Sequence, residues 1–382
     1  MTERSAPSSP RDCTLGRAYD GRRVLVTGHT GFKGSWLCEW LLALGAQVTA
    51  FSLAPDTSPA LFDQLGLAER LDDRTGDIRD PKPVMEVVDQ VQPDFVFHLA
   101  AQPLVRRAYR EPLLTYQTNV LGTVHLLEAL RPLQKPCAAV FVTSDKAYEN
   151  KEWVFGYRED DALGGFDPYS SSKAAAEIAI AAWRRSFFPA HPVRIASARA
   201  GNVIGGGDWS EDRIVPDCIR ALRQRQCVPV RNKKSTRHWQ HVLEPLSGYL
   251  WLAAVLHEPA HANCAPDQLA SAFNFGPSPN SNRPVVDLVR EVLKWWPGEW
   301  EDRSDPNAVH EAGLLQLCTD KAHALLAWRP VWEFAETVQH TIGWYREGES
   351  LKEAKGFREL TRSQIEAYCQ AAARLQIAWA KT

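Results

Sequence analysis

Short apolar runs alternate with longer amphipathic segments along the first 200 residues of the chain. Continuous apolar runs are typical of strands that are buried on both faces of a parallel sheet. Segments in which apolar residues recur every three or four positions are typical of helices that cover such a sheet. Strands are predicted at 23–27, 47–51, 94–99, 138–143 and 193–198, and helices at 35–44, 82–91, 114–130 and 169–187. This order predicts a doubly wound parallel α/β sheet over residues 21–200.

The regular alternation ends near residue 201. Beyond it we expect a helix at 213–224, a short strand at 273–276 and further helices to the end of the chain. Residues 201–382 are therefore interpreted as a smaller, mainly substrate-binding α/β region that partly returns to the main sheet. Residues 1–20 are rich in Ser, Pro and Arg and are predicted to be a disordered leader.

Composition narrows the possible functions. A formal charge of −2 over 382 residues gives no reason to expect a nucleic acid or an anionic membrane as partner. No uncharged apolar stretch is long enough to span a bilayer. The eight cysteines include no C-x-x-C pair, which argues against a disulfide framework or a metal site and for a reducing cytoplasm.

The first predicted strand ends in the glycine-rich segment Gly28-His-Thr-Gly31-Phe-Lys-Gly34. Gly28 permits a sharp turn, Gly31 lets a pyrophosphate approach the backbone, and Gly34 allows close packing of helix and strand. Anionic phosphates would meet free amides at the start of the helix. An ordinary tight turn is the alternative, but the flanking strand and helix favour a Rossmann dinucleotide site.

Tyr169 and Lys173 lie four residues apart, which places both on one face of a predicted helix. A tyrosine has a pKa of about 10, so it must lose roughly 3 units to act as a base near neutrality. One nearby cation supplies roughly 1–3 units, and an oxidised nicotinamide ring could supply more. The pair suits removal of a proton from an alcohol. The alternative interpretation is that Tyr169 and Lys173 simply lie on a helix face exposed to solvent.

The strand at 138–143 is followed by Ser144, Asp145 and Lys146. Because the carboxyl ends of parallel strands border the ligand crevice, these side chains are expected opposite Tyr169. A solvated ion pair in a loop is the alternative.

Together these motifs resemble those of the extended short-chain dehydrogenase/reductase superfamily. More closely, the chain resembles the nucleotide-sugar 4,6-dehydratases, and among them the subgroup that acts on CDP-glucose. The resemblance is carried by residues 26–34, 97–105, 119–123, 142–148, 169–173, 199–209 and 239–245. Ser144, Asp145 and Lys146 correspond to a triad in such dehydratases. Its third position is commonly a glutamate, but it is Lys146 here, as in the CDP-glucose subgroup.

The implied reaction is redox-neutral. Tyr169 would take the proton of the 4-hydroxyl while NAD takes the hydride, Lys146 would remove the proton on carbon 5, and Asp145 would protonate the departing 6-hydroxyl. Hydride return to carbon 6 would give CDP-4-keto-6-deoxyglucose. Ser144 would hold the oxygen on carbon 4, and Lys173 would hold the ribose and tune Tyr169.

The cofactor is expected to be NAD, on the strength of the resemblance. Residues 51–55, after the second strand, carry neither the acid typical of NAD sites nor the arginine typical of NADP sites, so weak retention is expected. The expected cofactor contacts are Gly28, Gly31, Phe32, Lys33, Gly34, Asp77, Ile78, Leu99, Ala100, Ala101, Asn119, Tyr169 and Lys173.

For the substrate, Arg213 and Arg237 lie where similar enzymes hold the nucleotide diphosphate, and Asn202 and Asn274 are further candidates. Exposed polar residues are the alternative for each. Competing functions are a 4-epimerase, a dehydratase for another nucleotide and a catalytically silent dinucleotide-binding protein. Related enzymes pair through two helices per subunit, so a homodimer or homotetramer is expected through residues 114–130 and 170–187.

Overall fold

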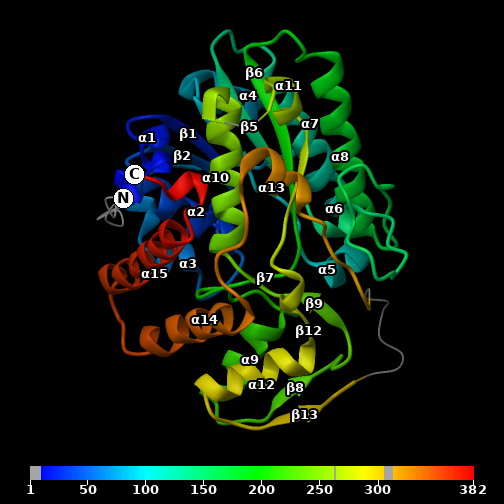
Figure 1. The fold of residues 1–382 in the computed structure, drawn as a ribbon, viewed down its shortest axis with the longest axis vertical. Coiled ribbons are helices and arrows are strands. Elements are labelled where there is room, and N and C mark those ends of the chain that lie inside the picture. Colours follow the sequence, from blue (N-terminus) through cyan, green and yellow to red (C-terminus); the bar gives the residue numbers. More distant parts are fainter. Residues whose placement is uncertain (1–9, 262–263, 305–312) are drawn as a thin grey trace.

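The structure, a computed structural model, describes residues 10–261, 264–304 and 313–382. A parallel sheet with helices on both faces forms the larger part of the molecule, and a smaller group of helices and short strands lies beyond one end of it (Figure 1). The predicted doubly wound α/β sheet is therefore confirmed.

The central sheet has seven strands. These are β1 (Arg23–Thr27), β2 (Gln47–Ser52), β3 (Asp72–Thr75), β4 (Phe95–His98), β5 (Cys137–Val142), β6 (Val193–Ala200) and β11 (Ala272–Phe275). Their order is β11-β6-β5-β4-β1-β2-β3, with all neighbours parallel. The chain changes winding direction between β1 and β4, and ligands of such sheets bind at the carboxyl ends of the strands beside this point.

Helices cover both faces of the sheet. One face carries α1 (Thr14–Tyr19), α2 (Phe32–Ala43) and α10 (Leu243–His257), with α15 (Ala354–Arg374) packed on α2. The other face carries α4 (Pro81–Val91), α7 (Gly122–Leu130) and α8 (Pro168–Ser186). Because side chains alternate along a strand, Val24 and Val26 enter the core on the α2 side while Leu25 enters the core on the α4 side.

The smaller region lies in the lower half of Figure 1. It is built from α9 (Ile214–Arg223), α12 (Val285–Trp295), α14 (Phe334–Gly348), β8 (Val228–Val230) and β13 (Trp300–Asp302). Short pairs are β7 (Val203–Ile204) with β10 (Gln240–His241) and β9 (Thr236–His238) with β12 (Asn282–Pro284). The remaining helices are α3 (Leu61–Gln64), α5 (Val105–Arg110), α6 (Pro112–Tyr116), α11 (Pro266–Leu269) and α13 (Asp320–Leu326).

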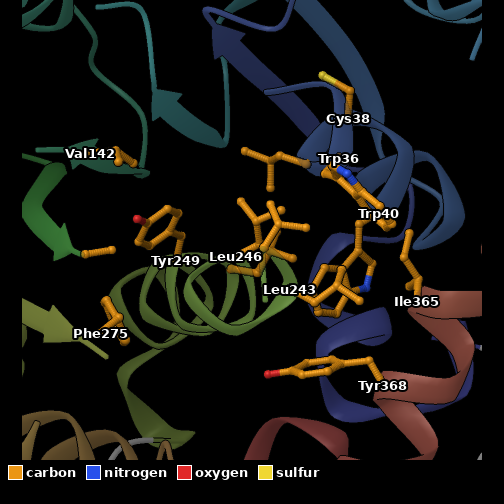
Figure 2. Close-up of a cluster of buried hydrophobic side chains, with 14 of the residues drawn as sticks. Trp36, Cys38, Trp40, Val142, Leu243, Leu246, Tyr249, Phe275, Ile365 and Tyr368 are labelled. Carbon is orange, nitrogen blue, oxygen red and sulfur yellow. The ribbon is translucent and has the colours of Figure 1, made fainter. Parts of the chain in front are cut away.

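The helix α10 lies within the largest buried cluster (Figure 2). Its apolar residues run all round the helix, as expected for one enclosed by neighbours on every side. The cluster joins α10 to α2 and α15, and its members include Trp36, Trp40, Leu243, Leu246, Tyr249, Ile365 and Tyr368. The C-terminal helix is thereby packed against the dinucleotide-binding part of the chain.

Two sequence expectations need comment. The disordered leader is wrong for residues 10–20, because α1 forms there and buries Leu15 and Tyr19 against the core; residues 1–9 lie outside the described residues. The predicted helix at 114–130 is three joined pieces, α6, a π-helical turn (Gln117–Leu121) and α7. No helix within the described ranges is long and apolar enough to cross a membrane.

Candidate active site

A large cleft runs along the carboxyl ends of β1, β2, β4 and β5 and encloses about 2360 Å³. Segments that follow these strands line one side, and segments from residue 201 onward line the other. A pocket for one small ligand typically encloses roughly 300–1,000 Å³, so this cleft has room for two nucleotides at once.

The glycine-rich turn forms the floor of the cleft after β1. Gly28 has a φ of 77°, and a Cβ there would lie 2.5 Å from the backbone nitrogen of Ala100. A Cβ on Gly34 would lie 2.2 Å from the carbonyl oxygen of Gly28. Gly31 caps the start of α2 and faces the cleft. The first amides of α2 therefore point to a place where an anion can approach them.

At the end of β2, the hydroxyls of Ser52 and Thr30 line the cleft where an acid is missing, and the buried His29 imidazole lies behind them. The Ser52 hydroxyl lies 3.2 Å from His29 Nδ1 and 2.9 Å from the Thr30 hydroxyl, and His29 Nε2 lies 2.8 Å from Asp73. Burial lowers the pKa of His29, with Asp73 opposing this effect. The ribose end of the cleft is thus polar without a free carboxylate at the second strand.

The next strands contribute Asp77, Ile78, Leu99, Ala100 and Ala101 to the cleft wall, as expected for cofactor contacts. The Asp77 carboxylate pairs with the Arg79 guanidinium, which lowers the pKa of Asp77. Phe32 and Lys33 of α2 also line the cleft. Burial lowers the pKa of Lys33 to about 7, and the positive charges of Arg213 and Lys173 contribute to this shift.

The helix α8 presents Tyr169 and Lys173 to the cleft. Its start is fixed by Asp167, whose carboxylate accepts hydrogen bonds from the backbone N–H groups of Tyr169 and Ser170 at 2.9 and 3.0 Å. Tyr169 and Lys173 are both buried, with 8% and 6% of their surface exposed. Lys173 Nζ lies 3.5 Å from the carbonyl oxygen of Val142 at the end of β5.

The acidity of the phenol differs from the sequence expectation. Burial raises the pKa of Tyr169 to about 12, although the Ser144 hydroxyl and the Arg213 charge act in the opposite direction. Burial also lowers the pKa of Lys173 to about 8. Within the chain, desolvation therefore outweighs the nearby cations, so the predicted acidity of the phenol depends on a further positive charge such as the oxidised nicotinamide ring.

The triad follows β5 in a single tight turn. Ser144 caps the short 3₁₀ helix Asp145–Ala147 (η4) by accepting from the backbone N–H of Lys146 at 3.2 Å, and its hydroxyl donates to Asp145 Oδ1 at 3.0 Å. Ser144 and Asp145 are buried, Lys146 is half-buried, and all three line the cleft with Tyr169.

Three of the four expected substrate contacts line the opposite wall: Asn202, Arg213 and Arg237. Arg213 stands just before α9 and pairs with Asp208 at 2.9 Å. Asn274 does not reach the cleft, and its assignment is a correction. It is fully buried, accepts a hydrogen bond from the Tyr148 hydroxyl, and donates to the carbonyls of Tyr157 and Cys318.

Asn119 also lies behind the cleft wall, where it cannot contact a cofactor directly. Its side chain bonds both backbone groups of Gln102 and donates to the Ser172 hydroxyl at 2.9 Å. Asn119 links the segment after β4 to α8, and it can affect a bound cofactor only by positioning these two segments.

Several arginines in the cleft were not singled out in the sequence. They are Arg79, Arg106, Arg107, Arg110, Arg220, Arg231 and Arg303. Arg106 and Arg231 both pair with Asp212, which joins α5 to the smaller region across the cleft. The clustering of basic residues near 106–110 and 220–231 could have indicated five of these arginines, but not Arg79 or Arg303.

Comparison with known proteins identifies the family of the chain. A family model described as GDP-mannose 4,6 dehydratase matches residues 25–341. The chain belongs to the GDP-mannose 4,6-dehydratase family. The resemblance to nucleotide-sugar 4,6-dehydratases that the motifs indicate is thus confirmed.

Individual relatives place the chain within this dehydratase family. The CDP-glucose 4,6-dehydratase of Salmonella typhimurium (strain LT2) is 45% identical over 334 residues, which cover 86% of this chain and 91% of that protein. A probable dTDP-glucose 4,6-dehydratase of Sinorhizobium fredii is 28% identical over 350 residues, covering 85% and 93%. The chain spans nearly the whole length of both.

Solved structures show the same fold. DesIV, a dTDP-glucose 4,6-dehydratase from Streptomyces venezuelae solved with NAD bound, matches with a TM-score of 0.73 at 23% identity and covers 86% of this chain and 98% of its own. A UDP-glucose 4-epimerase from Thermotoga maritima matches with a TM-score of 0.71 at 22% identity, covering 86% and 99%.

The residues of this family member fit NAD as cofactor. Gly28 and Gly34, where an added Cβ would collide with backbone atoms, keep the turn tight. Gly31 leaves the amides at the start of α2 open to the cleft. A pyrophosphate bound there would also lie near the Lys33 ammonium, which lines the same part of the cleft.

Proposed function

We propose that this protein converts CDP-glucose to CDP-4-keto-6-deoxyglucose in an NAD-dependent 4,6-dehydration. The observation that carries the proposal is the convergence of Ser144, Asp145, Lys146, Tyr169 and Lys173 on one cleft. The 45% identity to a CDP-glucose 4,6-dehydratase over most of both chains supports the same conclusion.

The glycine-rich turn, Asp77, Ile78 and the 99–101 segment would hold the cofactor. When bound, NAD would supply an acceptor for the hydride of carbon 4 and its donor to carbon 6, and its positively charged ring would favour the phenolate of Tyr169. Lys173 would hold the nicotinamide ribose beside that phenol.

Proton movements fall to the chain itself. Tyr169 Oη would take the proton of the 4-hydroxyl, and the Ser144 hydroxyl would hold the resulting carbonyl oxygen. The ketone acidifies the proton on carbon 5, and Lys146 Nζ would remove it. Asp145, buried beside Ser144, would protonate the 6-hydroxyl as it leaves as water.

The wall formed by residues from 201 onward would hold the substrate. Arg213 and Arg237 suit a diphosphate because a guanidinium can donate two parallel hydrogen bonds to it. Asn202 lines the same cleft and would be a further polar contact. Residues 21–200 would thus bind mainly cofactor, and residues 201–382 mainly substrate.

Incubation of the purified protein with CDP-glucose and NAD tests the function directly. A product lighter than the substrate by one water molecule is expected by mass spectrometry. A product of unchanged mass, with galactose configuration at carbon 4, would instead identify a 4-epimerase. UDP-, GDP- and dTDP-glucose assayed in parallel would show the base preference, and turnover fastest with another nucleotide would contradict the CDP assignment.

A homodimer or homotetramer is proposed on separate grounds. Large apolar side chains are exposed along α6, the π-helical turn and α8 and at the residue that follows α8, namely Leu113, Tyr116, Leu121, Ile178 and Phe187. Such a surface favours association with a second copy of the chain. Light scattering should give at least twice the mass of one chain, and Leu121→Glu with Ile178→Glu should reduce it. A cytoplasmic location is proposed as well, and the eight free cysteines support it because disulfides are rare in that compartment.

A further inference from the structure

Glu177 is a buried carboxylate that does not line the cleft. It lies on α8 one turn after Lys173 and is 2% exposed. Its oxygens accept hydrogen bonds from Ser197 Oγ at 2.8 Å, from Arg199 Nη2 at 2.9 Å and from the Thr143 hydroxyl. Tyr169, Lys173 and Glu177 therefore follow one another along a single face of α8.

The charge on Glu177 is balanced by Arg199. Burial alone would raise the pKa of Glu177, but the Arg199 charge and the hydroxyls of Thr143 and Ser197 outweigh it and lower that pKa. A buried ion pair is weak evidence for stability, because well-packed apolar residues in its place are often equally stable. Its contacts offer a better reason for its presence.

Those contacts lie on both sides of the catalytic turn. Thr143, which bonds Glu177, immediately precedes Ser144. Tyr148 follows the turn, and its hydroxyl oxygen accepts from Arg199 Nη1 at 2.7 Å while the guanidinium lies 4.9 Å from the centre of its ring. The Tyr148 hydroxyl donates in turn to Asn274, which explains why Asn274 is occupied away from the cleft.

We propose that Glu177 is a positioning residue for the reaction: paired with Arg199, it fixes both ends of the turn that carries Ser144, Asp145 and Lys146, and it supplies a negative charge one helical turn beyond Lys173. The two parts of this role meet at the end of β5. There Lys173 reaches the carbonyl of Val142 and Glu177 reaches the hydroxyl of Thr143.

Burial, and after it the charged groups near Lys173, determine its pKa. The titratable groups that face Lys173 are Tyr169 and Glu177 on α8, Lys33 on α2 and His98 at the end of β4. Burial lowers the pKa of Lys173 to about 8, and Glu177 opposes this shift. Lys33 adds repulsion, whereas His98 stays neutral because burial lowers its pKa to about 3. Loss of the Glu177 charge would therefore lower the pKa of Lys173 further.

The role inferred for Glu177 rests on the proposed function. The substitution Glu177→Gln tests that role. This substitution keeps the shape of the side chain and removes the charge. We expect kcat to fall about tenfold or more, since small misplacements of reacting groups are costly. The alkaline limb of the kcat profile should move to lower pH by about one unit, because Lys173 loses its proton earlier. The KM for CDP-glucose should change little.

Three further variants separate charge from position. Thr143→Val removes the contact beside Ser144 without changing any charge, so it should lower kcat and leave the alkaline limb in place. Ser197→Ala is the matched control: it removes a hydrogen bond to the same carboxylate from β6, away from the turn, and both readouts should stay near wild type. Glu177→Gln with Arg199→Met avoids an unpaired buried cation and should show the same shift of the limb.

A second readout needs neither substrate nor turnover. The pKa of Lys173 can be followed by NMR in ¹³C-lysine-labelled protein, with its signal assigned by Lys173→Arg, and it should be lower in Glu177→Gln than in wild type. An unchanged Lys173 pKa in a folded variant would overturn the charge part. Equal kcat for Thr143→Val and Ser197→Ala would overturn the positioning part. A wild-type protein inactive on CDP-glucose would count against the proposed function alone.

Discussion

Lys33 is a cleft residue whose charge is expected to change near neutral pH. It stands in the glycine-rich segment, and burial with repulsion from Arg213 lowers its pKa to about 7. A lysine with a lowered pKa is cationic below that value and neutral above it. An anionic diphosphate in the cleft should therefore bind more tightly as the pH falls through about 7.

This gives a prediction for NAD binding. In wild type, the affinity should fall by up to about tenfold between pH values of about 6 and 8, whereas Lys33→Met should bind weakly and with less pH dependence. Isothermal titration calorimetry at both pH values measures the difference. Lys352→Met, a change at an exposed residue outside the cleft lining, is the control. An identical pH dependence in wild type and Lys33→Met would contradict the prediction.

Residue roles were predictable where a motif fixed both spacing and position. Tyr169, Lys173 and the triad meet in the cleft because a helix face and a strand end place them there. Asn274 could not be placed, because its partners Tyr148, Tyr157 and Cys318 are distant in sequence. The raised pKa of Tyr169 was missed for a related reason: desolvation depends on everything packed around the phenol, which a spacing does not reveal.

At the scale of elements, two glycines of the turn between β1 and α2 are expected to differ in role: Gly28 is needed for folding, and Gly31 for binding NAD. Gly28→Ala should lower the free energy of unfolding by about 2 kcal/mol or more, because its φ of 77° strains an L-residue and its Cβ would meet Ala100. Gly31→Ala meets only the Gly28 carbonyl, at 3.5 Å, so it should fold normally and bind NAD weakly. Denaturant unfolding and calorimetry measure both. Equal stability of the two variants would refute this distinction.

The start of α8 offers a second test at this scale. Asp167→Ala removes the acceptor for two backbone N–H groups and for the Ser170 hydroxyl. The protein should lose about 1 kcal/mol of stability. Its kcat should fall as well, because Tyr169 lies in the affected first turn. Asp167→Asn keeps an acceptor and should retain most of the stability in thermal unfolding. Normal stability of the alanine variant would show that the cap is dispensable.

Elements were predictable where one periodicity ran without interruption. The strands at 94–99 and 138–143 were placed to within a residue or two because continuous apolar runs bury both faces. Residues 10–20 were misjudged because their polar composition hides Leu15 and Tyr19, which pack into a core formed by α10 and η7 (Ala378–Ala380). Such long-range packing overrides local composition.

At the scale of the whole molecule, Glu244 ties the central helix to the C-terminal part. Its carboxylate accepts from the backbone N–H groups of Val331 and Trp332 and from the Tyr368 hydroxyl. Burial raises the pKa of Glu244 to about 7. An acid with a raised folded-state pKa contributes full stability below its unfolded value, and that contribution is lost as the pH rises through about 7.

Stability should therefore fall by up to about 3 kcal/mol from this group between pH values of about 4.5 and 7. Glu244→Gln, which does not titrate, should lose less stability over the same interval. Denaturant unfolding of both proteins across this range measures the difference. Parallel stability curves would show that the Glu244 carboxyl titrates normally in the folded protein.

The edge position of β11 has a consequence for biosynthesis. β11 pairs with β6, yet some seventy residues separate the two strands in the chain, from Ala200 to Ala272. During translation, the edge of β6 that pairs with β11 therefore keeps unpaired backbone amides and carbonyls until β11 has been synthesised. Unpaired borders of this kind recruit other strands, so slow translation through this interval would increase the demand for chaperones.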